Sequence, residues 1–269
     1  MRIQPGILIL LVVWLIPMGW GDEFVGEKSL WNGYPHYRFW YDDRPCQVVV
    51  PHQPAEGKPW IWRARFWGHR PEVDLVLLEK GFYLVYIDVA NLYGSPRAVA
   101  HWDAFYRFLT VEKGFAPKAV LEGMSRGGLI VYNWAKKNPE KVVCIYADAP
   151  VCDIRSWPGG KSEGQGSPED WARCLAAYGL TEEEASQFRG NPIDGLALLA
   201  QTKVPLLHVC GDADPIVPIH ENTRVLEKRY TEAGGPIQVL VKPGVGHVHG
   251  LDDPTPIVDF ILNALAGNQ

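Results

Sequence analysis

Short apolar runs alternate with helix-like segments over most of this chain, and few folds accommodate that alternation. The run FYLVYI at 82–87 lies between Gly81 and Asp88 without a charged side chain, as is typical of a strand buried on both faces. Other strand-like runs lie at 37–51 (two strands around a turn), 60–66, 119–122, 142–147, 204–209 and 237–241. Helix-like segments lie at 72–80, 99–113, 127–137, 220–231 and 256–265. We therefore expect an α/β fold, with a mainly parallel sheet flanked by helices.

Residues 151–201 interrupt this alternation. They contain two glycine-rich stretches, Pro158-Gly159-Gly160 and Gly164-Gln165-Gly166, and short helical pieces without a strand. We expect a helical cap or lid inserted after one strand and lying over the strand ends, within a single domain at 22–269. The alternative is a structural excursion with no role in binding.

The first 21 residues have the layout of a signal peptide. Arg2 supplies a positive charge, residues 7–16 are apolar, and Gly19 and Gly21 precede a predicted cut before Asp22. Ten apolar residues fall short of the roughly 20 needed to span a bilayer, which disfavours the alternative of a retained anchor. We expect a secreted or periplasmic protein with no membrane association after signal removal.

Charge and cysteine content narrow the function classes. The chain has 26 basic and 31 acidic residues and no basic block, so we expect no nucleic-acid partner. None of the five cysteines has zinc-ligand spacing, and we expect no metal site. Because export exposes thiols to oxidation, a disulfide between Cys152 and Cys174, which flank a loop-rich segment, is the pairing that we favour.

The sequence Gly123-Met124-Ser125-Arg126-Gly127 follows a strand-like run and precedes a helix-like segment. Glycines on both sides allow a sharp turn that exposes the serine hydroxyl at the carboxyl edge of a sheet. The helix that begins there directs unpaired N–H groups toward an anion, as acyl transfer requires. The alternative is a helix-capping serine in a glycine-rich turn.

A serine nucleophile needs a base and a carboxylate that orients it, and both residue types follow later strands. Asp212 and Asp214 come after the run at 204–209, and His247 and His249 come after the run at 237–241. The order Ser, Asp, His is the order of the α/β-hydrolase triad.

On these motifs the chain resembles the α/β-hydrolase superfamily over roughly residues 46–266. Two segments match the superfamily's acid and histidine loops through Gly211, Asp214, Val217 and Pro218, and through Gly244, Gly246, His247 and Pro254. The resemblance implies that Ser125 is the nucleophile, Asp214 the acid and His247 the base. Asp148 and His249 are the alternative acid and base.

The resemblance also implies an oxyanion hole made of two N–H groups. One belongs to Arg126, after the nucleophile, and the other to Phe66, with Arg65 or Trp67 as alternatives. The Ser-Arg turn resembles that of glucuronoyl and other carbohydrate esterases, in which the arginine side chain helps to hold the oxyanion. The alternative for that side chain is a surface ion pair.

Tryptophans are frequent, and Trp67 and Trp157 are the candidates for substrate contact, although core packing explains most of them. We expect an exported serine hydrolase of carboxylic esters that needs no cofactor. Its substrate would be a small-molecule or glycan ester, with acetyl or glucuronoyl esters of carbohydrate as the specific hypothesis. The alternatives are a prolyl-oligopeptidase-like peptidase, disfavoured because 248 residues leave no room for a propeller domain, and a non-catalytic glycan-binding protein.

Overall fold

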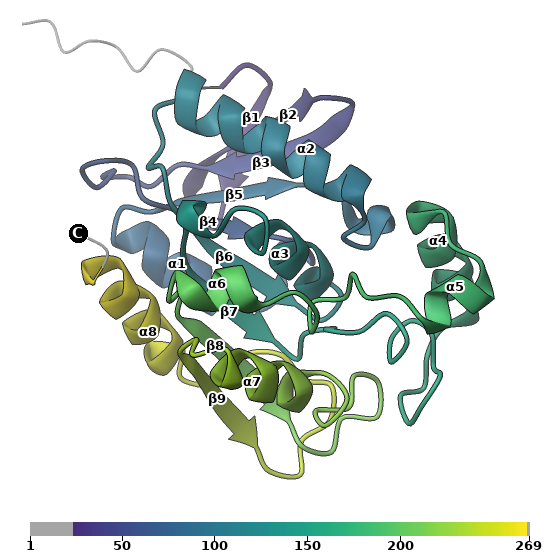
Figure 1. Ribbon diagram of the computed structural model, residues 1–269. Coiled ribbons are helices and arrows are strands. Elements are labelled where there is room, and N and C mark those ends of the chain that lie inside the picture. The colour runs from purple at the N-terminus through teal and green to yellow at the C-terminus, as the bar shows by residue number, and fades with distance from the viewer. Residues whose placement is uncertain (1–23, 268–269) are drawn as a thin grey trace, which may run out of the picture.

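The computed structural model describes residues 24–267, and the predicted signal peptide at 1–21 lies outside them. A nine-stranded sheet crosses the molecule in the order β1-β2-β3-β5-β4-β6-β7-β8-β9 (Figure 1). The strands are β1 Glu27–Trp31, β2 Tyr34–Tyr41, β3 Arg44–Val49, β4 Trp60–Arg63, β5 Tyr83–Ile87, β6 Ala119–Met124, β7 Val142–Asp148, β8 Leu206–Gly211 and β9 Ile237–Lys242. β1, β2 and β3 pair antiparallel up to β5, and every pairing from β5 to β9 is parallel.

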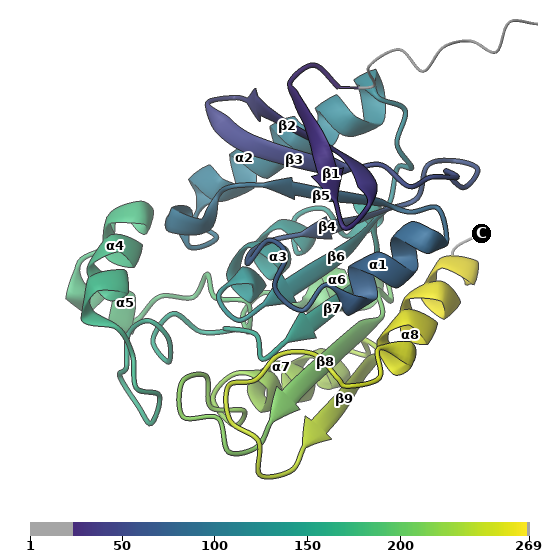
Figure 2. The same cartoon turned by 180° about the vertical axis from the view of Figure 1, so that it is seen from behind.

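Helices cover both faces of the sheet. One face carries α2 (Pro96–Arg107), α3 (Gly127–Ala135), α6 (Ala197–Gln201) and α7 (Thr223–Glu232), and the other carries α1 (Glu72–Glu79) and α8 (Thr255–Ala266) (Figures 1 and 2). The buried side chains form a separate cluster on each face, because central strands such as β5 are buried on both sides. The predicted α/β class is therefore confirmed.

Trp60 and Trp62 of β4 pack in the core, whereas Trp40 of β2 is 73% exposed. Trp62 stacks on Trp102 of α2 with ring centroids 3.9 Å apart, and Trp60 lies 5.3 Å from Trp62. All three are nearly inaccessible to solvent. These rings therefore fill the space between the sheet and α2.

Three elements differ from the sequence expectation. The edge strand β1 was not predicted, because its alternation of residues is weak. The helix expected at 99–113 begins earlier, with Pro96 in its first turn, and continues beyond Arg107 as a π-helical turn at Phe108–Glu112. The strand expected to reach Phe66 ends at Arg63, and the loop that follows contains Phe66 in the left-handed region with a φ of 55°.

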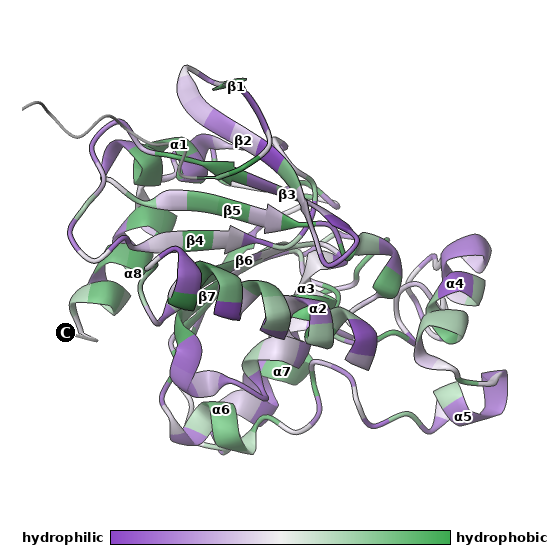
Figure 3. Cartoon of the chain, turned by 90° about the horizontal axis from the view of Figure 1, so that it is seen from above, coloured by the Kyte–Doolittle hydropathy of each residue, from purple (hydrophilic) through white to green (hydrophobic). Residues whose placement is uncertain are grey.

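Residues 151–201 contain three helices of different placement. α4 (Pro168–Tyr178) and α5 (Glu182–Ser186) lie beyond the carboxyl ends of the strands (Figure 1). They show more hydrophilic residues than the central strands (Figure 3). α6 instead buries Leu199 and Ala200 in the core cluster beside α7. The part that projects over the strand ends is therefore shorter than the whole segment.

The predicted disulfide between Cys152 and Cys174 is wrong, since both are free thiols. Cys152 packs in the cluster beneath α3, whereas Cys174 of α4 packs with Trp171 in the cluster beneath the projecting helices. Burial raises the pKa of both thiols.

No helix within residues 24–267 is long and apolar enough to cross a membrane.

Candidate active site

Ser125 occupies a tight turn between β6 and α3. Its φ of 48° is unusual for a residue with a side chain, and such strain is typical of functional turns. The turn is held by neighbouring backbone: Ser125 N–H donates to Asp148 O at 2.8 Å, and Val151 N–H donates to Ser125 O at 2.9 Å. Gly128 is required for this packing, since a Cβ there would lie 2.8 Å from Pro150 Cβ.

The structure brings Ser125, His247 and Asp214 together from three loops at the carboxyl ends of β6, β9 and β8. His247 Nε2 lies 3.0 Å from Ser125 Oγ, and His247 Nδ1 lies 2.6 Å from Asp214 Oδ2. These two contacts use both ring nitrogens, so the imidazole links the hydroxyl to the carboxylate. Ser125 remains 9% exposed, while the Asp214 side chain is 1% exposed.

Hydrogen bonds keep Asp214 in its charged form. Burial by itself raises the pKa of a carboxyl, but the His247 contact and the N–H groups of Ile216 and Val217 lower the pKa of Asp214 below its ordinary value. Oδ1 accepts both N–H groups, which leaves Oδ2 for His247. An ionised carboxylate in this position stabilises the imidazolium that forms when His247 takes a proton.

The two alternative residues occupy other positions. Asp148 accepts the Tyr146 hydroxyl at 2.6 Å and Gly250 N–H at 2.7 Å, so it anchors the loop that carries His247. Burial raises the pKa of Asp148. His249 lies beside the triad and contacts His69, with His249 Nδ1 3.2 Å from His69 Nε2. Neither residue takes part in the contacts that link Ser125 to Asp214.

The two expected oxyanion donors are the backbone N–H groups of Arg126 and Phe66. Neither N–H has a hydrogen-bond acceptor within residues 24–267. Arg126 precedes the first turn of α3, and Phe66 lies on the loop that follows β4. That loop lies against the nucleophile turn, because a Cβ on Gly127 would be 3.3 Å from Arg65 Cβ. The loop and the start of α3 are thus adjacent at the serine.

The Arg126 side chain forms an ion pair rather than reaching toward Ser125. Its Nη1 lies 3.0 Å from Asp170 Oδ1 on α4, and its guanidinium lies 5.5 Å from the Trp157 ring and 5.9 Å from the Tyr93 ring. Asp170 also accepts the hydroxyls of Tyr93 and Ser167. Burial raises the pKa of Asp170, but these donors and Arg126 lower it overall. The alternative of an ion pair therefore describes this side chain.

The two candidate tryptophans are placed differently. Trp157 lies beside Arg126 under the projecting helices, close to the nucleophile turn. Trp67 stacks on His36 with centroids 5.4 Å apart and contacts Trp31 and Tyr86. The ring of Trp67 therefore packs against the β1–β2 hairpin, whereas the ring of Trp157 lies beside Arg126.

Sequence reasoning missed a buried charged cluster behind the site. Arg63 at the end of β4 pairs with Asp74 and Glu122, and all three side chains are at most 1% exposed. The signal was present in the sequence, because Arg63 ends the apolar run WIWR and Glu122 interrupts the apolar run AVLEG. Charged residues are rarely fully buried unless they are paired.

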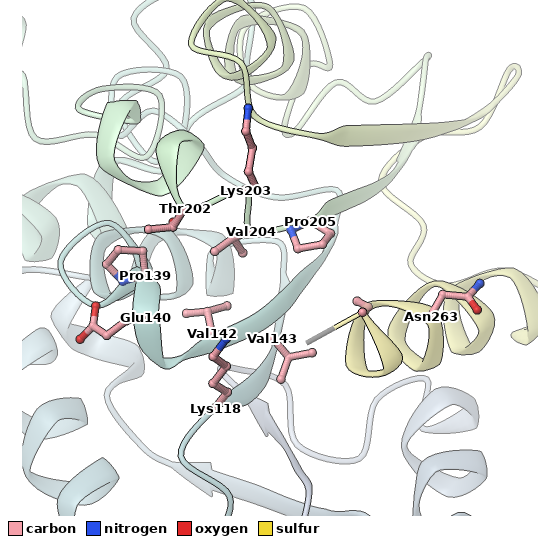
Figure 4. A pocket seen from close by; sticks show the side chains of 12 residues that line it. Lys118, Pro139, Glu140, Val142, Val143, Thr202, Lys203, Val204, Pro205 and Asn263 are labelled. Carbon is pink, nitrogen blue, oxygen red and sulfur yellow. The ribbon is translucent and has the colours of Figure 1, made fainter. Parts of the chain in front are cut away.

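The pocket in Figure 4 lies away from this site. It is lined by residues at the amino ends of β6, β7 and β8, including Lys118, Val142 and Val204. Ser125 follows the carboxyl end of β6, so the pocket is at the opposite edge of the sheet. Among the described residues, no group of three or more His, Cys, Asp or Glu side chains could hold a metal ion.

Comparison with known proteins identifies the family. The model of the prolyl oligopeptidase family matches residues 107–266, which is more than half of the chain and includes Ser125, Asp214 and His247. The chain belongs to the prolyl oligopeptidase family. Acylamino-acid-releasing enzyme 2 of Oryza sativa subsp. japonica is 25% identical over 158 residues, covering 55% of this chain and 19% of that protein. The chain spans about a fifth of the length of the curated relatives it matches.

Solved structures share the fold. Dipeptidyl peptidase 4 of Porphyromonas gingivalis aligns with a TM-score of 0.65 at 16% identity, covering 88% of this chain and 35% of that one. Est1E from Butyrivibrio proteoclasticus aligns with a TM-score of 0.58 at 19% identity, covering 86% of this chain and 99% of that one.

The family corrects the predicted activity. The expectation of a carboxylic-ester hydrolase acting on carbohydrate esters is wrong, because the family model and the curated relatives point to peptidases. The resemblance of the Ser-Arg turn to glucuronoyl esterases has no support. The prediction of an esterase used the chain length to disfavour a peptidase. The family match does not depend on a propeller domain, because it covers residues 107–266 of the α/β fold.

Proposed function

We propose that this protein is a serine peptidase that cleaves amide bonds through an acyl-enzyme on Ser125. The observation that carries the proposal is the relay from Ser125 Oγ through His247 to Asp214, at 3.0 and 2.6 Å, in a member of the prolyl oligopeptidase family. A relay of this geometry supplies a nucleophile, a base and a carboxylate that orients the base.

In the proposed reaction His247 Nε2 takes the Ser125 proton as Oγ attacks the scissile carbonyl. The N–H groups of Arg126 and Phe66 stabilise the oxyanion of the tetrahedral intermediate. His247 then gives its proton to the departing amine, which leaves an acyl-enzyme and frees the amine product. Water, deprotonated by His247, attacks the acyl carbon, and the proton returns to Ser125 as the acid is released. Asp214 stays ionised throughout and stabilises the imidazolium.

The names of the relatives suggest the substrate class. One relative is named for the release of acylamino acids, and a structural neighbour is named a dipeptidyl peptidase. We propose that this chain cleaves short peptides near their amino end. Trp157 and the projecting helix α4 would contact the residues on the acyl side, since they adjoin Arg126 directly after the nucleophile.

The experiment compares amide and ester hydrolysis by the purified protein. Arylamides of single amino acids, dipeptides and N-acetylated amino acids form the amide panel, and p-nitrophenyl acetate and acetylated sugars form the ester panel. We expect hydrolysis of at least one arylamide that Ser125→Ala abolishes, with circular dichroism as the folding control. Ester hydrolysis without any amide hydrolysis by a folded wild-type protein would contradict the proposal.

Export also stays a proposal, resting on the sequence of residues 1–21. Expression of the whole chain in a bacterial host, followed by fractionation and amino-terminal sequencing, tests it. A mature protein that begins at Asp22 outside the cytoplasm is expected, and an uncleaved cytoplasmic protein would contradict it.

A further inference from the structure

The Arg63 side chain connects the two backbone segments that flank Ser125. It is 1% exposed and lies at the end of β4, next to the nucleophile strand β6. Its donors reach the loop that follows β4 and also Met124, the residue directly before the nucleophile, where Nη2 lies 3.3 Å from Sδ. No other part of the proposed mechanism uses this guanidinium.

On the loop side, Arg63 binds three backbone carbonyls. Nε donates to Arg65 O at 3.3 Å and to Phe66 O at 3.2 Å, and Nη2 donates to His69 O. His69 N–H in turn donates to Phe66 O at 3.0 Å, which closes a tight turn around the left-handed Phe66. A guanidinium is suited to this task because its donors form a rigid planar fork.

Two carboxylates hold the guanidinium in place. Nη1 binds Asp74 Oδ2 at the start of α1, and it lies 3.1 Å from Glu122 Oε1 on β6, three residues before Ser125. Burial raises the pKa of Glu122, and the guanidinium faces both carboxyl groups within this buried cluster. The cluster therefore fixes the end of Arg63 against both β6 and α1.

We propose that Arg63 is a positioning residue, which holds the turn at 65–69 so that the Phe66 N–H is directed at the oxyanion formed on the Ser125 adduct. This inference rests on the proposed function of Ser125. Without the three carbonyl contacts, the left-handed turn at Phe66 loses its fixed orientation, while the relay from Ser125 to Asp214 keeps all of its own contacts. The oxyanion hole and the relay are thus supported separately.

The primary variant is Arg63→Lys, which keeps the charge but cannot donate to three carbonyls and a carboxylate at once. Loss of one oxyanion donor lowers kcat by about 10²–10³-fold in serine peptidases, so we expect a decrease in kcat of about 10–100-fold for partial misplacement. KM should change by less than about threefold, because the oxyanion contact is made in the transition state. Arg229→Lys is the control, since Arg229 of α7 binds Ile193 O and Asp194 and not the turn at 65–69.

Two readouts distinguish this inference from the proposed function. The first is the rate at which a fluorophosphonate labels Ser125, which requires the nucleophile and its oxyanion hole but no knowledge of the natural substrate. The second is amide hydrogen exchange over residues 64–69. We expect Arg63→Lys to slow labelling at least tenfold and to speed exchange in this turn alone, with Arg229→Lys unchanged in both. A wild type that is labelled but cleaves no amide would reject the peptidase proposal and leave this test valid.

A replacement of the whole cluster covers the case in which Arg63→Lys does not fold. Exchanging a buried ion cluster for apolar residues of similar size is often neutral or stabilising, so Arg63→Met with Asp74→Leu and Glu122→Gln retains a packed core. We expect this folded triple variant to label slowly. Labelling at the wild-type rate by a folded variant that lacks the Arg63 contacts would overturn the inference.

Discussion

The Asp170 carboxylate lies 3.0 Å from the Arg126 guanidinium, and this ion pair joins helix α4 to the residue that follows the candidate nucleophile. The same carboxylate accepts the Tyr93 hydroxyl at 2.5 Å and the Ser167 hydroxyl at 3.0 Å. The Asp170 side chain therefore attaches α4 to the residue after the candidate nucleophile, and the Tyr178 hydroxyl attaches α4 to Tyr93 O and Asn133. Because both members of the pair are about one-fifth exposed, the contact contributes more to placement than to stability.

Asp170→Asn should loosen this attachment. We expect the thermal midpoint to fall by only a few degrees, because partly exposed pairs contribute roughly 0–1 kcal/mol. KM for peptide arylamides should rise several-fold, since the ion pair would no longer fix Arg126 against α4, while kcat should fall less than KM rises. Steady-state kinetics and a thermal melt check this.

Glu169→Gln is the matched control, because Glu169 lies one residue away on α4 and its ion pair within residues 24–267 is with the exposed Arg173. It should leave both parameters unchanged. A loss of kcat with constant KM in Asp170→Asn would contradict a role in placing the substrate side of the site.

The fold and the contacts among Ser125, His247 and Asp214 could be predicted because their signals are local. Apolar runs between glycines mark the buried strands, and Gly211, Asp214, Gly246 and His247 stand directly after two of them. Carboxyl ends of parallel strands meet at one edge of the sheet, so residues that follow different strands come together without any need to predict side-chain contacts. The contacts from Ser125 to His247 and from His247 to Asp214 have this origin.

The remaining features depend on contacts between distant residues. Asp170 lies 44 residues from Arg126, and nothing in either local sequence pairs them. Trp67 was a candidate for substrate contact because of its position after a strand, but its ring turns toward His36 across the sheet edge. Ser125, His247 and Asp214 do not by themselves predict which bond is cleaved, since the same three groups attack both esters and amides.

His247 and His249 should differ sharply when replaced. His247→Ala removes the base and should lower kcat by about 10⁴–10⁶-fold at nearly constant KM. His249→Gln keeps a polar side chain near His69 and should retain activity within about tenfold. Amide hydrolysis and fluorophosphonate labelling check both. Equal losses in the two variants would contradict the assignment of His247 as the base.

Two buried histidines should make the fold sensitive to acid. Burial lowers the pKa of both His208 and His249 to about 3. Below pH of about 6.5 the unfolded chain binds protons that the folded chain excludes, so the free energy of unfolding falls as the pH drops from about 6.5 toward 3. Each histidine contributes a slope of up to about 1.4 kcal/mol per pH unit in that range.

Urea unfolding between pH 4 and pH 7.5 checks this slope. His249→Gln should reduce the slope of the free energy of unfolding against pH by the contribution of one histidine. A wild-type stability that stays constant between pH 6.5 and pH 4.5 would contradict the expectation.

Glu122→Gln tests the protonation of the buried cluster. Burial raises the pKa of Glu122, so above its ordinary value near 4.5 the folded state keeps a proton that the unfolded state releases. Wild-type stability therefore decreases as the pH rises through the interval between the two pKa values. The amide variant has no proton to release, so its stability relative to wild type should rise with pH over the same interval.

Asp74→Asn, which removes the other carboxylate from Arg63, should instead destabilise by about 3–5 kcal/mol, as expected when one partner of a buried ion pair is lost. Equal destabilisation by the two variants at pH 7 would mean that Glu122 is ionised and pairs with Arg63 as fully as Asp74 does.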